Sequence, residues 1–163
     1  LKDAGAMIKS ENISTIGGEL IGDIIISNAA LQRPLRISGA ETVAGLIDEL
    51  PMLAVLSAVA TGQFELHDAA ELRTKESDRI KALVINLEKL GFKCEEYPDG
   101  FRVKSREKVP TGKVMIETFL DHRIAMSFSI ASYFEKAEIC LDDRDAIAVS
   151  FPNFFEVIES LRA

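Results

Sequence analysis

Three short segments of the sequence carry side chains that could bind an anion or move a proton. They are Asp48–Pro51, Leu72–Arg79 and Asp121–Met126, and each lies where we expect a helix to begin. The first turn of a helix has unpaired N–H groups and a partial positive charge, which stabilise anions. Acidic residues are therefore ordinary at these places, whereas basic residues oppose the helix dipole.

Four basic or titratable side chains lie at these expected helix starts: Lys75, Arg79, His122 and Arg123. Several departures from the usual charge preference in one chain suggest that an anionic ligand binds there and neutralises them. The same segments contain no glycine-rich phosphate loop, nucleophile elbow or HExxH motif. Spacing alone therefore indicates an α/β repeat domain with a candidate anion site.

Each of these residues also has a purely structural interpretation. Asp48 and Asp121 could serve only as helix N-caps. Lys75 and Arg79 are four residues apart and have acidic neighbours, so a solvated surface network is the simpler interpretation of either one alone. His122 forms no zinc-ligand spacing with the other histidine of the chain, and we expect no metal.

The composition predicts a single globular domain in the cytoplasm. The chain has 163 residues, of which 47% are hydrophobic and 28% charged, with a net charge of −7. This balance argues against a nucleic-acid or anionic-membrane surface, which must be basic. No apolar stretch approaches the ~20 residues that span a bilayer, and the N-terminus lacks a signal-peptide layout. Cys94 and Cys140 form no motif and are interpreted as reduced, buried thiols.

The elements that must position the candidate residues occur in a repeating order. An apolar helix followed by a short strand is expected over 48–66 and again over 121–141. This alternation is typical of an α/β (α+β) fold. We expect almost two copies of one unit, followed by a C-terminal helix, over about 1–68, 69–143 and 150–162.

Helix boundaries and burial can also be predicted. Residues 50–60 and 124–134 are apolar almost all round, so both helices should be buried. Residues 80–90 show one apolar stripe at helical spacing. The last helix should begin with Ser150 as its N-cap and Pro152 in its first turn.

Four short sequence motifs occur in the order and spacing of a known protein family. They are DELPMLAVL at 48–56, LRTKESDRI at 72–80, DHRIAM at 121–126 and SFPNFFE at 150–156. Together they resemble the enolpyruvylshikimate-phosphate synthases. The match runs along essentially the whole chain and corresponds to the C-terminal part of such an enzyme. The opening residues, which resemble the last turn of a helix, agree with a piece of a longer chain.

The resemblance implies two domains, each with three βαβαββ units around a pseudo-threefold axis, as an inside-out α/β barrel. Substrates would bind between the domains, and this chain would hold the end of one unit and most of two more from a single domain. The N-terminal portion of the same enzyme would be its partner, and we expect a monomer.

The resemblance also implies an activity. Family members transfer the enolpyruvyl group of phosphoenolpyruvate to the 5-hydroxyl of shikimate 3-phosphate, without a cofactor, in the shikimate pathway to chorismate and the aromatic amino acids. Asp48 matches the aspartate that contacts the acceptor hydroxyl and would act as base. Lys75 matches a proton-transfer and charge-stabilising lysine. Glu76, expected to be buried beside Lys75, matches the carboxylate proposed to serve the methylene carbon.

The remaining site residues match groups that hold phosphoenolpyruvate. Arg79 and Arg123 would grip its carboxylate and phosphate, since a guanidinium offers paired donors. His122 and Asp121 would support Arg123. The sequence departs from the common pattern at Val149, where many members have a lysine, and at Glu71, where a subgroup has an asparagine.

Two alternatives remain open at this point. The chain could be a non-catalytic anion-binding or assembly domain of the same fold. It could also belong to an enzyme that transfers enolpyruvyl to another acceptor, such as UDP-N-acetylglucosamine. We expect the 163-residue chain by itself to be inactive, because the family's other ligands lie outside it.

Overall fold

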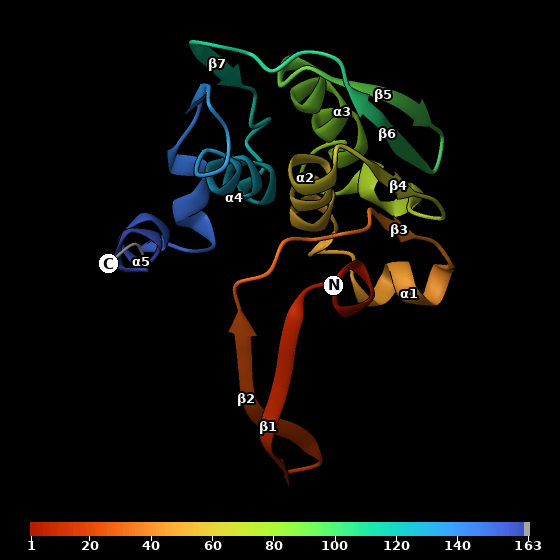
Figure 1. The fold of residues 1–163 in the computed structure, drawn as a ribbon, viewed down its shortest axis with the longest axis vertical. Coiled ribbons are helices and arrows are strands. Elements are labelled where there is room, and N and C mark those ends of the chain that lie inside the picture. The colour runs from red at the N-terminus through yellow and green to blue at the C-terminus, as the bar shows by residue number, and fades with distance from the viewer. Residues whose placement is uncertain (162–163) are drawn as a thin grey trace.

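The computed structural model describes residues 1–161, which form a mixed α/β structure (Figure 1). The strands are β1 (Met7–Ile16), β2 (Glu19–Ser27), β3 (Leu35–Ile37), β4 (Phe64–Leu66), β5 (Phe92–Tyr97), β6 (Gly100–Arg106), β7 (Lys113–Ile116) and β8 (Glu138–Leu141). The α-helices are α1 (Ala40–Gly45), α2 (Leu50–Thr61), α3 (Arg79–Lys89), α4 (His122–Ala131) and α5 (Phe154–Ser160). Three 3₁₀ helices are η1 (Lys2–Ala4), η2 (Ala70–Thr74) and η3 (Asp145–Val149).

A four-stranded sheet in the order β3-β4-β6-β5 forms the framework on which α2 and α3 pack. β3 and β4 run parallel, with Leu35 opposite Phe64, and β7 and β8 form a second parallel pair. Parallel neighbours need a crossover, which α2 supplies in the first pair and α4 in the second. This repetition supports the division of the chain near residue 68, which we retain as a proposal.

Helix α3 has the apolar stripe that the sequence predicts. Ile80, Leu83 and Leu87 are completely buried against the sheet, together with Phe64 and Phe101. The helix begins where the Asp78 carboxylate accepts a hydrogen bond from the Lys81 N–H, which satisfies one of the free donors of the first turn. The predicted stripe over 80–90 is confirmed.

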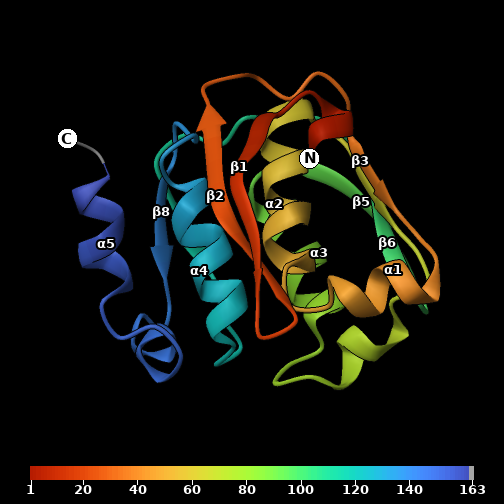
Figure 2. The same cartoon turned by 90° about the horizontal axis from the view of Figure 1, so that it is seen from below.

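Helices α2 and α4 pack against each other, but each buries only part of its surface (Figure 2). Met52, Leu56 and Val59 of α2 are half-buried and line an open hollow of about 560 Å³, to which Ile130 and the exposed Phe134 also contribute. The prediction that both helices are buried all round is therefore wrong for this face. α4 also ends at Ala131 rather than 134, and a turn follows it.

The C-terminal helix begins later than the sequence predicts. α5 starts at Phe154 with Asn153 as its N-cap residue. Ser150 instead follows η3 as its C-cap residue, and its N–H donates to the Ile147 carbonyl. The predicted N-cap at Ser150 is therefore wrong, because the preceding residues form a separate 3₁₀ helix. The predicted end at residue 162 lies outside the described residues.

Strands β1 and β2 form an antiparallel hairpin that extends away from the other elements (Figure 1). Its turn uses Gly17 and Gly18, whose φ values of 62° and 88° suit a tight hairpin. Within residues 1–161, the hairpin pairs with no third strand. Its exposed apolar side chains are Met7, Ile13, Ile16, Leu20, Ile21, Ile24, Ile25 and Ile26.

The two cysteines are free and lie in strands, Cys94 in β5 and Cys140 in β8. Both are half-buried rather than fully buried as predicted. Burial, with a smaller contribution from the charge of Glu88, raises the pKa of Cys94 to about 12. Its thiol therefore stays protonated and weakly reactive near neutral pH.

Candidate active site

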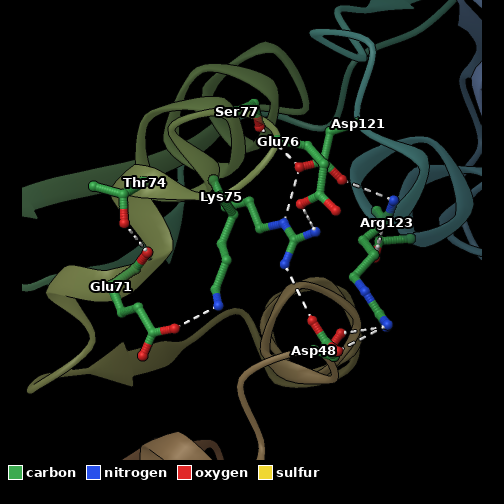
Figure 3. Close-up of polar contacts among 10 residues, drawn as sticks. Asp48, Glu71, Thr74, Lys75, Glu76, Ser77, Asp121 and Arg123 are labelled. Atoms are coloured by element: carbon green, nitrogen blue, oxygen red, sulfur yellow. Dashed lines mark hydrogen bonds and ion pairs between the residues drawn. The ribbon is translucent and has the colours of Figure 1, made fainter.

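The predicted site residues converge at the beginnings of three helices (Figure 3). Asp48 lies just before α2, Lys75 and Glu76 lie in the loop before α3, and Asp121 is the N-cap residue of α4. These residues are far apart in the sequence, and the packing of α2, α3 and α4 brings them together. The group contains both acidic and basic side chains.

Arg79 lies at the centre of the group and is almost completely buried, with 1% of its side chain exposed. Its Nε donates to Asp121 Oδ2 at 2.8 Å, and its Nη2 donates to Glu76 Oε2 at 2.5 Å. Its Nη1 lies 3.4 Å from Asp48 Oδ1. A buried charge needs such partners, because burying it unpaired is costly. The charge of Arg79 is therefore neutralised by carboxylates of the protein itself, whereas the sequence analysis predicts an anionic ligand for this purpose.

Asp121 connects the start of α4 to the start of α3 and is completely buried. Its Oδ1 accepts the N–H of Arg123 at 2.9 Å, which confirms the predicted N-cap. Its Oδ2 accepts bonds from Arg79 and, at 3.0 Å, from the Ser77 hydroxyl. Burial opposes the charge of Asp121, but these bonds outweigh it and hold the pKa of the carboxyl below its usual value of 3.8.

Asp48 faces two arginines and does not cap a helix. The N-cap residue of α2 is Glu49, without a capping bond from its side chain. Arg123 Nη2 lies 3.1 Å from Asp48 Oδ2, and Arg123 Nη1 donates to the Asp48 backbone carbonyl at 2.8 Å. The purely structural interpretation of Asp48 as an N-cap is therefore wrong, and its half-exposed carboxylate remains accessible.

Lys75 and Glu76 point to different partners. The Lys75 ammonium bonds Glu71 Oε1 at 2.5 Å. Glu76 is 51% exposed and bonds Arg79, so the expectation of a buried carboxylate beside Lys75 is wrong. Glu76 lies three residues before Arg79, and its carboxylate contacts the Arg79 guanidinium rather than the ammonium of the adjacent Lys75.

His122 is the first residue of α4 and is half-buried. The contacts described for Arg123 join it to Asp48 and Asp121, and none in residues 1–161 joins it to His122. Asp121 contacts Arg123 through its carboxylate, which accepts a hydrogen bond from the backbone N–H of Arg123. The same part of the chain has no group of three or more His, Cys, Asp or Glu side chains placed to hold a metal ion.

The arrangement offers a defined set of chemical groups. Two guanidiniums and one ammonium can bind phosphate or carboxylate groups, and Asp48 and Glu76 are exposed enough to exchange a proton with a bound molecule. Because carboxylates of the protein already pair with these cations, an anionic ligand would have to displace one of the carboxylates in order to bind.

A model of the family described as EPSP synthase (3-phosphoshikimate 1-carboxyvinyltransferase) matches residues 1–158. The chain belongs to this family. It is 65% identical to the 3-phosphoshikimate 1-carboxyvinyltransferase of Chloroherpeton thalassium over 162 residues, which cover 99% of the chain and 37% of that protein. Its identity to the Prosthecochloris aestuarii enzyme of the same name is 61% over 159 residues, covering 98% and 37%.

A solved structure agrees with the EPSP synthase assignment. An EPSP synthase from Acinetobacter baumannii matches with a TM-score of 0.86 and 37% identity, over 98% of this chain and 37% of that chain. The predicted α/β fold is confirmed. The chain spans about 37% of the length of the curated relatives that it matches.

Both departures from the common EPSP synthase pattern have a clear place in the structure. Glu71, at the start of η2, holds the Lys75 ammonium. Val149 ends η3 and is almost fully exposed. Sequence analysis missed Ser77, a partner of Asp121, although this serine lies inside the LRTKESDRI word. Within residues 1–161, no helix is long and apolar enough to cross a membrane.

Proposed function

We propose that the complete protein containing this chain transfers the enolpyruvyl group of phosphoenolpyruvate to the 5-hydroxyl of shikimate 3-phosphate and releases phosphate. The single observation that supports this most directly is the convergence of Asp48, Lys75, Glu76, Arg79 and Arg123 at three helix starts (Figure 3). A domain kept only for assembly has no physical need to hold acids and cations together in this way. Because both substrates are charged metabolites, we propose that the protein acts in the cytoplasm.

The reaction requires two steps with opposite proton movements. In the first step the acceptor oxygen loses its proton and bonds to C2 of phosphoenolpyruvate, while C3 gains a proton. In the second step the bond from C2 to the phosphate oxygen breaks, phosphate leaves and C3 loses a proton. The enzyme must therefore provide a base, an acid that can reverse its role, and positive charge for phosphate and carboxylate.

The proposed roles follow from where each side chain lies. Asp48 is half-exposed and would accept the hydroxyl proton. Glu76 is accessible and would serve C3, and Lys75 would leave Glu71 to stabilise charge between the two substrates. Arg123 would hold phosphoenolpyruvate through its exposed edge.

Arg79 and its partners complete the proposed phosphoenolpyruvate site. Its guanidinium is held rigidly by Asp121, so only its bonds to Glu76 and Asp48 can be exchanged for substrate oxygens. Such exchange would also free both carboxylates for proton transfer. Asp121 would fix the start of α4 and thereby the position of Arg123, and His122, the first residue of that helix, would have a supporting role that none of the described contacts accounts for.

The test is product analysis by mass spectrometry with the complete protein. Phosphoenolpyruvate is supplied with either shikimate 3-phosphate or UDP-N-acetylglucosamine, and Lys75→Met, which keeps the length of the side chain without its charge, serves as control. We expect the enolpyruvyl ether of shikimate 3-phosphate from the wild-type protein only. Product from the nucleotide sugar alone would contradict the proposed acceptor, and no product from either would favour a non-catalytic domain.

A further inference from the structure

Arg73, at the end of η2, makes a dense set of contacts for a side chain that the proposed mechanism does not use. Its Nη1 donates to Asp78 Oδ2 at 2.8 Å, and its Nε donates to the Pro98 carbonyl at 2.8 Å. Its Nη2 donates to the Tyr97 carbonyl at 2.5 Å and lies 2.8 Å from Glu96 Oε1. One guanidinium therefore joins η2, the start of α3 and the turn between β5 and β6.

These contacts close the loop that carries Lys75 and Glu76. The loop begins after Thr74 and ends at Asp78, so Arg73 and its partner lie on either side of it. Asp78 uses one carboxylate oxygen for Arg73 and the other as the N-cap of α3. The guanidinium thus ties both ends of the loop to each other and to the sheet.

Outside the Arg73 contacts, three side chains of the loop have one partner each, and one of them is Ser77, which donates to Asp121 Oδ2 at 3.0 Å. Lys75 bonds Glu71, which is largely exposed, and Glu76 bonds Arg79. Arg79 is fixed independently, because its Nε donates to the completely buried Asp121, the N-cap residue of α4. Loss of the Arg73 contacts should therefore loosen the loop while leaving Arg79 in place, and it should affect Lys75, whose partner is exposed, more than Glu76, whose partner is buried.

Only an arginine can make this set of contacts. The planar fork presents several fixed donors, and here they reach two carbonyls and two carboxylates at once, whereas a lysine ammonium is a single point charge. Only 24% of the side chain is exposed. Burial opposes its charge, but the bonds to Asp78 and Glu96 outweigh that and raise the pKa of Arg73 above its ordinary value.

We propose that Arg73 is a positioning residue that holds the 75–78 loop so that Lys75 and Glu76 meet the substrates. This inference rests on the proposed function, since it assigns no chemistry to Arg73 itself. Misplacement of reacting groups by about 1 Å can lower a rate by about 100-fold. The expected signature is a fall in turnover with little change in the apparent affinity for phosphoenolpyruvate.

The test compares Arg73→Lys with Arg36→Lys in the complete enzyme. Arg36 is an exposed arginine with one long ion pair of 3.8 Å, so its replacement should have no effect. For Arg73→Lys we expect kcat to fall by about 10- to 100-fold, and the KM for phosphoenolpyruvate to change by less than about threefold. Hydrogen exchange of the amides at 74–77 should accelerate in the free enzyme, while those of α3 stay protected.

Several results would overturn the proposal. A kcat within about twofold of wild type would do so, as would unchanged exchange in the loop. If Arg73→Lys does not fold, Asp78→Asn replaces it, because asparagine keeps a cap oxygen for Lys81 and loses the ion pair with Arg73. A folded Asp78→Asn enzyme with normal kcat would equally contradict the role. If the wild-type enzyme itself has no turnover, the proposed function fails, and the exchange data still decide whether Arg73 holds the loop.

Discussion

At the scale of single residues, Asp48 has a carboxylate that contributes to the candidate site without capping the helix that it precedes. It precedes α2 but does not cap it, and its carboxylate faces Arg79 and Arg123 instead. Its backbone carbonyl also accepts a bond from Arg123, which a substitution of the side chain would leave intact. Chemistry and local structure can therefore be tested separately at this residue.

Asp48→Asn should lower kcat of the complete enzyme by about 100-fold, which is within the usual contribution of a general base. The melting temperature should change little, because asparagine has nearly the same shape and Arg79 keeps two other carboxylates. Steady-state kinetics and thermal unfolding would measure both. Glu49→Gln is the matched control, and equal turnover in both variants would remove Asp48 from the proposed chemistry.

Asp121 gives a pH-dependent prediction. Its carboxyl has a pKa below the usual 3.8 in the folded chain, so it stabilises the fold at all pH values above 3.8. That contribution is lost as the pH falls below 3.8 and through the lowered pKa. Asp121→Asn should therefore cost about 3 kcal/mol near neutral pH, as expected when one partner of a buried ion pair is removed.

Denaturant unfolding over a pH series would test this prediction, with the exposed Asp3→Asn as control. The stability difference between wild type and Asp121→Asn should be constant at neutral pH and shrink in acid. A difference that grows on acidification, or none at neutral pH, would show that Arg79 does not depend on this carboxylate.

At the scale of elements, the loop from β7 to α4 contains two consecutive residues in the left-handed region. Phe119 and Leu120 have φ values of 55° and 58°. L-residues adopt this conformation at a cost of about 1–2 kcal/mol each. The loop leads directly into Asp121, so this backbone conformation helps to direct the start of α4 toward the site.

Leu120→Gly should stabilise the protein by about 1 kcal/mol, because glycine adopts positive φ without strain. Little burial is lost, since Leu120 is 77% exposed. Val149→Gly is the control at another exposed position, where the φ is not positive and glycine should destabilise. Urea unfolding would measure both changes, and a destabilised Leu120→Gly would mean that its side chain has a contact that offsets the backbone strain.

Local sequence patterns predicted the elements better than they predicted the contacts between them. The stripe of α3 and the cap at Asp121 could be predicted because both depend on residues a few positions apart. The burial of Arg79 could not, since Asp48 and Asp121 are separated from it by 31 and 42 residues. Ser150 was a plausible cap by residue type, and the competing 3₁₀ helix displaced it.

The family resemblance predicted which residues belong together, and packing decided how they pair. Glu76 was expected at Lys75, yet it bonds Arg79, and Lys75 bonds Glu71. Side-chain direction in a loop depends on backbone conformation, which short sequence words do not specify. The resemblance therefore named most of the residues that lie together at the candidate site, but not the ion pairs among them or the Arg73 contacts.

At the scale of the whole molecule, the hairpin of β1 and β2 exposes many apolar side chains and pairs with no third strand within residues 1–161. The equivalent hairpin of the second proposed unit, β5 and β6, is covered by α3 and pairs with β4. Because the chain spans about 37% of its curated relatives, we expect residues outside it to pair with β2 and cover the hairpin.

This expectation predicts different hydrogen exchange in the isolated chain and the complete protein. A two-stranded hairpin is marginally stable alone, so amides at 7–27 should exchange rapidly in the isolated chain. They should be protected in the complete protein, while amides of α3 serve as a reference protected in both. Equal protection of the hairpin in both forms would show that it needs no partner.

Like the hairpin, the candidate site is partly exposed in this chain. Asp48, Glu76 and Arg123 are partly exposed to solvent, whereas the proposed reaction needs two reactants held together and shielded from water. The isolated chain should therefore bind phosphoenolpyruvate weakly and show no turnover. Addition of the separately produced remainder of the enzyme should restore some activity if the two parts dock.

Phosphate release from phosphoenolpyruvate plus shikimate 3-phosphate tests the central claim most directly. The complete protein should release phosphate only when both substrates are present, and Lys75→Ala should abolish the release. The isolated 163-residue chain should release none. Turnover by the isolated chain that Lys75→Ala abolishes would contradict the claim that these residues form one wall of a two-sided site, and no release by the complete protein would contradict the proposed activity.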